Sequence, residues 1–230
     1  MQIKKSALFL FFLFLVSALP AQQLESAGSS QGSSVVQISA KEHFDKGKMF
    51  SDQNDLDNAI SEFTEAIRLD PNFSDAYAYR ARVYNGKQDY DRALADSNTA
   101  LRLNTNNAIG YLARGSAYSG KTDYDSAIAD YTQAIRLDPN YAGTYYNRGN
   151  AYSGKTDYDS AIADYTQAIR LDPNFAFAYG NRGNAYQYGK KDYDSAIADF
   201  TQMIRLNPNE AGAYYNRGNV LDFTPIGAHS

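Results

Sequence analysis

Between residues 142 and 175, hydrophobic and polar positions recur in a pattern that predicts two short helices joined by a turn. In the first helix, Tyr145, Arg148, Gly149 and Tyr152 fall on one face of a 3.6-residue period. The apolar stripe of the second helix consists of Ala161, Ile162, Tyr165, Ala168, Ile169 and Leu171. Each helix therefore has one face to bury.

Local residues mark where these two helices begin and end. Residues 153–156 (SGKT) are typical of a turn. Asp157 follows at an N-cap position, where its carboxylate accepts hydrogen bonds from the first free amide groups of the second helix. Asp159 in the first turn suits the helix dipole, and Pro173 cannot continue the helix. The sequence thus predicts a helix-turn-helix unit that closes at Pro173.

The same pattern returns along the chain with a period of 34 residues. Residues 117–140 and 151–174 are identical letter for letter. The proline near the end of each copy divides the chain into the units 40–73, 74–107, 108–141, 142–175 and 176–210, with a partial sixth unit at 211–221. The fifth unit is one residue longer than the others. Because one helix pair cannot cover its own apolar face, we expect the units to stack into an all-α solenoid.

The two ends of the chain differ from the repeats. Residues 1–21 combine two lysines, an apolar run and small residues near a cleavage site, which predicts a secretory signal peptide. Residues 22–39, rich in Ser, Gly and Gln, are expected to form a flexible linker, and residues 222–230 a C-terminal tail. An uncleaved signal that tethers the array to a membrane is the alternative for the N-terminus.

Composition narrows the function further. The chain carries 22 basic and 26 acidic side chains, which argues against nucleic acid as the main partner. With no cysteine, neither thiolate chemistry nor a Cys-ligated metal is available. The two histidines, His43 and His229, lie at opposite ends, and the sequence offers no catalytic triad, metal cluster or phosphate loop. We expect no catalysis, cofactor or metal site.

These units resemble the tetratricopeptide repeat (TPR) family, in which an aromatic, Gly and an aromatic precede Ala, an aromatic, Ala and Pro. The fourth unit supplies Tyr145, Gly149, Tyr152, Ala161, Tyr165, Ala168 and Pro173. The third unit has the same residue types, and the fifth differs only in Phe200 and Met203. The first unit has His43 for an aromatic, and the second has Ala81, Ser97 and Thr105 for Gly, an aromatic and Pro. The resemblance covers residues 40–221.

The resemblance implies a right-handed TPR superhelix of five helix-turn-helix repeats plus a terminal helix. It also implies that the second, fifth, sixth, ninth, twelfth and thirteenth positions of each unit line a concave wall. Mapped onto this chain, the expected peptide-binding residues are Asn147, Asn150, Asn181, Asn184, Asn216, Asn219, Tyr146 and Tyr215. An amide at each step of the array would bind the backbone of an extended peptide without reading its sequence closely.

Two other interpretations of these positions remain open. The asparagines are equally typical of solvated helix faces that were copied when the repeats duplicated. The family's carboxylate clamp, which combines Lys and Arg with Asn, would leave Lys41, Lys48 and Arg82 as its remnants. Asp45 and Tyr79 stand where that clamp needs asparagines, so the sequence disfavours it.

Two further features of the sequence predict specific contacts. Arg80, Arg114, Arg148, Arg182 and Arg217 recur at one position of the first helix, and Asp96, Asp130, Asp164 and Asp199 on the second helices are their expected partners. The partial sixth unit keeps the character of an internal repeat, which suggests self-association through this end. We therefore expect an exported bacterial scaffold that binds a protein or peptide in the periplasm or outside the cell. A structural spacer or self-assembling envelope protein without a peptide ligand is the alternative.

Overall fold

The computed structural model describes residues 39–223, and all regular secondary structure in that range is helical. The first helix occupies residues 39–52. It is followed by α2 (Leu56–Leu69), α3 (Ser74–Gly86), α4 (Tyr90–Leu103), α5 (Ala108–Gly120), α6 (Tyr124–Leu137), α7 (Ala142–Gly154), α8 (Tyr158–Leu171), α9 (Ala176–Ala185), the π-helical turn η1 (Tyr186–Lys190), α10 (Tyr193–Leu206) and α11 (Ala211–Phe223).

Most of the predicted N-terminal segments lie outside the described residues. The signal peptide (1–21) and the linker up to residue 38 are not described. The C-terminal tail from residue 224 also lies outside the described residues. Residue 39, which we assigned to the linker, is already helical. At the other end α11 continues through Phe223, two residues beyond the predicted end of the sixth unit.

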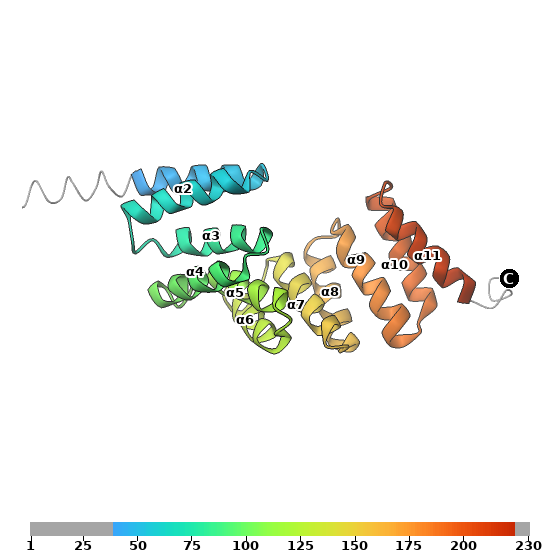
Figure 1. The fold of residues 1–230 in the computed structure, drawn as a ribbon. Helices are drawn as coiled ribbons and strands as arrows, with labels where there is room; N and C mark the ends of the chain where they lie inside the picture. The colour runs from blue at the N-terminus through green and yellow to red at the C-terminus, as the bar shows by residue number, and fades with distance from the viewer. Residues whose placement is uncertain (1–38, 224–230) are drawn as a thin grey trace, which may run out of the picture.

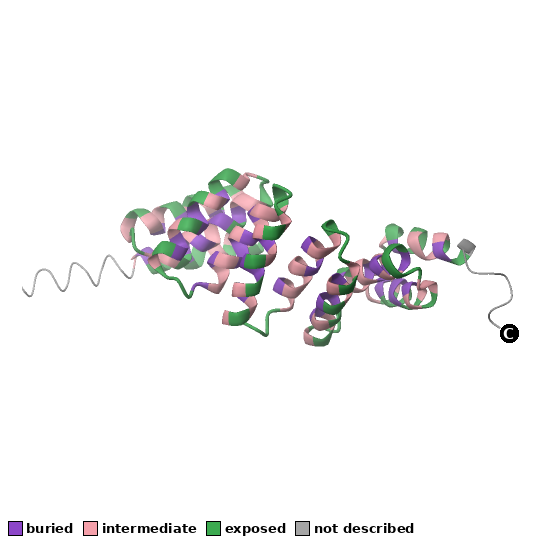
Figure 2. Ribbon diagram, turned by 90° about the horizontal axis from the view of Figure 1, so that it is seen from below, coloured by how far each residue is buried: buried purple, intermediate pink, exposed green. Residues whose placement is uncertain are grey.

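The helices stack in chain order into an elongated array, with the first helix and α11 at opposite ends (Figure 1). Each helix packs against the helices before and after it. The buried residues form a series of small clusters, each built from one unit and its neighbour, rather than one central core. Figure 2 shows buried positions along the whole length of the array. No unit buries its apolar face without a neighbour.

The turn inside each unit is set by two adjacent residues. Asn54, Gln88, Thr122, Thr156 and Lys191 adopt positive φ between 53° and 62°, and the next residue is always the N-cap aspartate. The side chain of Asp157, for example, accepts a hydrogen bond from the amide of Ser160. In the fifth unit the extra residue is absorbed by η1, so that Lys191 and Asp192 keep the standard turn.

In every full unit but the second, which has Ala81 there, the two helices cross closely at a glycine. A Cβ placed on Gly149 would lie 2.7 Å from the ring of Tyr165, and one on Gly115 would lie 2.9 Å from the ring of Tyr131. Both rings are buried. Gly218 is the equivalent residue in α11, and a Cβ there would meet nothing within 4 Å. The crossing therefore needs a glycine where an aromatic ring of the second helix lies against it.

A bidentate ion pair fastens the same two helices. The Nε and Nη2 atoms of Arg148 donate to the two carboxylate oxygens of Asp164 at 2.7 and 2.8 Å. The third nitrogen, Nη1, donates to Thr132 of the preceding unit at 3.0 Å. Equivalent bonds join Arg80 to Asp96 and Thr64, Arg114 to Asp130 and Asn98, and Arg182 to Asp199 and Thr166. The predicted arginine–aspartate pairing is confirmed in these four units.

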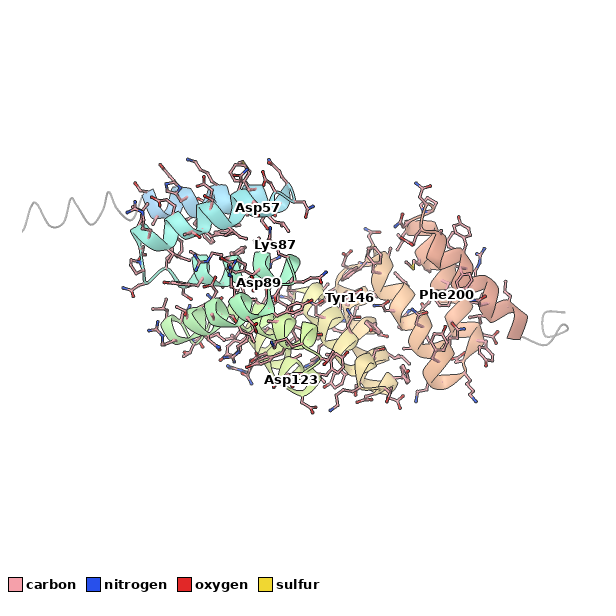
Figure 3. The ribbon with its side chains drawn as sticks, viewed as in Figure 1. Asp57, Lys87, Asp89, Asp123, Tyr146 and Phe200 are labelled. Carbon is pink, nitrogen blue, oxygen red and sulfur yellow. The ribbon has the colours of Figure 1, made fainter. Side chains whose placement is uncertain are left out.

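The ion pair with aspartate also changes the pKa of the arginine. Hydrogen bonding to Asp164 raises the pKa of Arg148 above its usual value. In the first unit a different pair joins the two helices: His43 Nδ1 lies 2.6 Å from Glu62 Oε2. A second, exposed series of pairs joins successive turns, as Lys87 does with Asp57 at 2.6 Å (Figure 3). Such exposed pairs contribute little to stability.

We predict opposite outcomes for the same substitution at the two equivalent glycines. Gly149→Val forces its side chain into the buried ring of Tyr165 and should lower the free energy of unfolding by about 2 kcal/mol. Gly218→Val faces open space and should change that free energy by no more than about 0.5 kcal/mol. Chemical denaturation of both variants gives the two values. Equal losses would show that the crossing does not depend on the glycine.

Candidate functional site

The predicted asparagines lie on the wall formed by α7, α9 and α11, and several of them bond to one another. Asn181 Nδ2 donates to Asn150 Oδ1 of the preceding unit at 2.8 Å, and to the hydroxyl of Tyr146 at 3.1 Å. One step along the array, Asn216 Nδ2 lies 3.4 Å from Asn184 Oδ1. The sixth position of one unit thus reaches the ninth position of the unit before it. We call this arrangement the amide ladder.

The ladder borders a hollow of about 150 Å³ between α7 and α9. It is lined by Asn150, Ser153, Tyr165, Asn181 and Asn184. Tyr165 comes from α8, and its hydroxyl donates to Asn150 Oδ1 at 2.8 Å. Burial raises the pKa of Tyr165, as it raises that of Tyr131 to about 12, so both hydroxyls keep their protons at neutral pH. All the polar groups around the hollow are therefore uncharged.

The ladder uses only part of the hydrogen-bonding capacity of its amides. Each asparagine has two N–H donors and one carbonyl oxygen. Asn150 accepts two hydrogen bonds through its oxygen, while Asn181 donates two through its nitrogen. The nitrogen of Asn150 and the oxygen of Asn181 have no partner among the described residues. The hollow therefore presents both a donor and an acceptor.

The remaining predicted residues have different surroundings. The ring of Tyr146 packs 6.0 Å from that of Tyr165 and 4.8 Å from that of Phe175, so it supports the wall and does not stand free on it. Tyr215 is 69% exposed. Asn147 and Asn219 are half-buried and bond to no other described side chain. The structure brings Asn150, Asn181 and Asn184 to one hollow, but not Asn147, Asn219 or Tyr215.

The two halves of the wall differ in how their first helices meet. α3 and α5 approach closely along their length, around a cluster of fully buried alanines that includes Ala81, Ala113 and Ala117. α7 and α9 approach closely at only a few points. The side chains between them are the polar ones of the ladder, which are larger than alanine. At the position that Ala113 occupies in α5, α9 carries Asn181, and its side chain lines the hollow.

The N-terminal part of the wall carries charge instead of amides. Lys41 bonds both carboxylate oxygens of Asp45, at 2.5 and 2.6 Å. Lys48 lies 5.5 Å from the ring centre of Tyr79, and Arg82 lies 5.3 Å from the same centre. Lys48 and Arg82 form no ion pair with a described carboxylate. A carboxylate clamp with asparagines is not built here, because an acid and an aromatic ring occupy those places.

Two residues of the hollow were missed by sequence reasoning. Ser153 was assigned to a turn, yet α7 extends through Gly154 and carries Ser153 on the wall. It occupies the twelfth position of its unit, one of the positions that the resemblance assigns to the concave wall. Tyr165 was interpreted only as a core residue. Its hydroxyl reaches the wall from the second helix, and no pattern within the first helix could have indicated this.

The comparisons with known families match the repeats directly. Four family models, described as TPR repeat or tetratricopeptide repeat, match residues 44–108, 121–155, 142–175 and 178–210, which together span more than half of the chain. The chain belongs to the tetratricopeptide repeat family. No curated protein sequence matches it significantly.

Solved structures of TPR proteins share the fold. A thermophilic TPR protein from Thermus thermophilus aligns with a TM-score of 0.67 at 19% identity, over 79% of this chain and 98% of that one. The MamA protein aligns with a TM-score of 0.60 at 28% identity, over 72% and 96% of the two chains. YrrB, described as a TPR protein with an unusual peptide-binding site, aligns with a TM-score of 0.60 at 22% identity, over 76% and 90%. The right-handed TPR solenoid predicted from the sequence is confirmed.

The family and the described residues together limit the chemistry. TPR arrays are in general non-catalytic modules of protein interaction. Among residues 39–223, no group of three His, Asp or Glu side chains is placed to hold a metal ion. None of the helices in that range is both long and apolar enough to cross a bilayer. The part of the wall formed by α7, α9 and α11 offers uncharged hydrogen-bonding groups at regular intervals.

Two asparagine substitutions test whether the amide ladder stabilises the array. Asn181→Ala removes two hydrogen bonds between neighbouring units and should lower the free energy of unfolding by about 1 kcal/mol. Asn147→Ala, at the same position one unit earlier, breaks no bond to a described residue and should be neutral or slightly stabilising, because alanine is the better helix former. Thermal unfolding followed by circular dichroism separates the two. Identical melting curves would mean that the ladder does not link the units.

Proposed function

We propose that this protein is a non-catalytic scaffold that binds an extended peptide segment of a partner protein on its concave wall. The hollow between α7 and α9 carries this proposal. It lies on the wall that TPR arrays present to their partners, and its free groups are amides. An extended peptide backbone offers alternating N–H and C=O groups that match a donor and an acceptor side by side.

The geometry favours weak binding with little sequence preference. A small, open hollow that contacts backbone atoms adds affinity without reading side chains. Lys48 and Arg82 lie on the same wall toward the N-terminus and are not neutralised by described carboxylates. An acidic side chain at that end of the peptide would be attracted to them. The proposed ligand is thus an extended segment with an acidic residue toward repeats one and two.

A structural spacer is the competing function. In that case the wall has no ligand, and the amide ladder serves only to hold neighbouring units together. The bonds between Asn181 and Asn150 are compatible with this alternative, since they exist without any ligand. Self-assembly in the cell envelope belongs to the same alternative. The two functions differ in whether the unused donor and acceptor of the ladder contact a peptide.

We also propose that the scaffold works outside the cytoplasm of a bacterium. The support is the lysine-containing start, the apolar run and the small residues of positions 1–21. An uncleaved segment would instead tether the array to the membrane. N-terminal sequencing of the protein from cells that export it distinguishes the two, and an intact Met1 in a cytoplasmic fraction would contradict both.

Peptide binding is tested by a substitution that fills the hollow. A library of random linear peptides displayed on phage is selected on the full chain, and enriched peptides are measured by fluorescence anisotropy. Ser153→Phe places a ring among Asn150, Tyr165 and Asn181, and should weaken binding about tenfold or more.

The matched control is Ser119→Phe, at the same position of the third unit, where no amide ladder exists. It should keep most of the affinity. Equal affinities for the two variants would show that the hollow is not the site. A library from which the wild-type chain enriches no peptide would favour the spacer.

A further inference from the structure

The last helix, α11, buries one face and repeats the residues of an internal first helix on the other. Ala213 and Val220 are buried, and Val220 packs with Ala196 and Phe200 of α10. This is the contact by which α3, α5, α7 and α9 each cover the helix before them. In those internal units the opposite face is covered by the second helix of the same unit. Nothing in the described chain covers that face of α11.

The uncovered face has space of a definite shape. Gly115, Gly149 and Gly183 each face the ring of the second helix, with an added Cβ 2.7 to 3.0 Å from Tyr131, Tyr165 and Phe200 respectively. The equivalent residue of α11 is Gly218, which has nothing within 4 Å. The backbone of α11 is therefore as bare as that of the internal helices at the point where an aromatic ring would sit.

The same face carries an arginine that has no aspartate partner among the described residues. Arg217 holds its guanidinium 5.8 Å from the ring centre of Tyr214, and the internal arginines lie 5.6 to 5.8 Å from the rings of Tyr111, Tyr145 and Tyr179. Arg114, Arg148 and Arg182 each bond both oxygens of an aspartate in this pose. For Arg217 the side chains described up to Leu221 provide no carboxylate. Its pose is that of a paired arginine.

The apolar residues of this face are exposed as well. Tyr214 is 45% and Leu221 is 46% exposed, whereas their counterparts Tyr145 and Tyr152 in α7 are half-buried. Glycine, arginine and two apolar side chains thus form one surface, which we call the α11 face: Tyr214, Arg217, Gly218 and Leu221.

The internal units show what fits such a face. Except in the second unit, where Ser97 replaces the aromatic, their second helices share a small residue, then an acid three positions on, an aromatic next to it, and a second small or slender residue three further on. The examples are Ala127, Asp130, Tyr131 and Ala134 in α6; Ala161, Asp164, Tyr165 and Ala168 in α8; and Ala196, Asp199, Phe200 and Met203 in α10. Residues 222–230 (DFTPIGAHS) do not contain this pattern.

We propose that the α11 face docks an amphipathic helix of a partner protein that carries this pattern. Its aromatic side chain would lie over Gly218, and its carboxylate would accept the two hydrogen bonds that Arg217 is posed to donate. The charge of Arg217 sets the preference for an acid, and the open space at Gly218 sets the preference for a ring. This surface is separate from the hollow on the concave wall and does not depend on peptide binding there.

A second copy of this chain is a poorer occupant than another protein. Each helix with the required pattern is already packed between two first helices of its own array, as α8 is between α7 and α9. To dock on α11 of another copy, it would have to leave that position. The occupant we infer is therefore a helix whose patterned face is free before binding.

The probe for this proposal is a synthetic peptide of residues 155–174 (KTDYDSAIADYTQAIRLDPN), which contains the pattern of α8. Its binding to the full chain is followed by fluorescence anisotropy. We expect saturable binding that weakens about tenfold or more with Arg217→Ala or Gly218→Leu, because the first removes the cation and the second fills the space for the ring. Peptides that carry Asp164→Ala or Tyr165→Ala should bind the full chain more weakly by a similar factor.

Two controls locate the binding. Arg205→Ala removes another exposed arginine, in the last turn of α10, and should leave the affinity unchanged. Ser153→Phe fills the concave hollow and should also leave it unchanged, which separates this surface from the proposed peptide site. Binding that is lost with Ser153→Phe but kept with Arg217→Ala would overturn the proposal.

A covalent version covers the case of a peptide that is too weakly helical alone. Residues 222–230 are replaced by residues 153–174, which continue the unit in register after Leu221. The melting temperature should rise, and Arg217→Ala should lower it in the extended chain but not in the parent. No rise in this chain, together with no saturable binding of the peptide, would overturn the proposal. Concentration-dependent light scattering that Gly218→Leu abolishes would also overturn it, by assigning the α11 face to a second copy.

Discussion

The bidentate arginine–aspartate pair is the interaction on which the array depends. In repeats two to five it joins the two helices of a unit, and its third nitrogen reaches a side chain of the preceding unit. The aspartates are nearly buried, with side-chain exposures of 6 to 11%. Replacing such a pair with apolar residues can be harmless, but removing one partner leaves a buried charge and is costly. The pair therefore fixes how each helix is placed along its neighbour.

Much of the fold could be predicted from the sequence, because the residues that set each helix pair lie within the repeat itself. The aspartate caps, the closing prolines and the arginine–aspartate spacing are local signals, and they recur often enough to be recognised. The link from Asn181 to Asn150 could not be predicted, since it depends on the rotation between neighbouring units. The contribution of Tyr165 to the hollow depends instead on how α8 crosses α7 within one unit. The extra residue of the fifth unit was visible, but its accommodation as a π-helical turn was not.

The two proposed surfaces follow from two departures from a uniform array. On the concave wall, Asn181 of α9 stands at the position that the buried Ala113 occupies in α5, and a polar hollow opens between α7 and α9. At the end of the described chain, α11 keeps the glycine and arginine of an internal helix, and no described helix covers them as a second helix does in the internal units.

A double-mutant cycle on Arg148 and Asp164 tests this account most directly. Chemical denaturation gives the free energies of unfolding of the wild type, Arg148→Ala, Asp164→Ala and the double variant. We predict that Arg148→Ala costs about 3 kcal/mol and that the double variant is no less stable than this single one, because the buried carboxylate is then gone. Two small losses that simply add would contradict the account, since the pair would then not fasten the repeat.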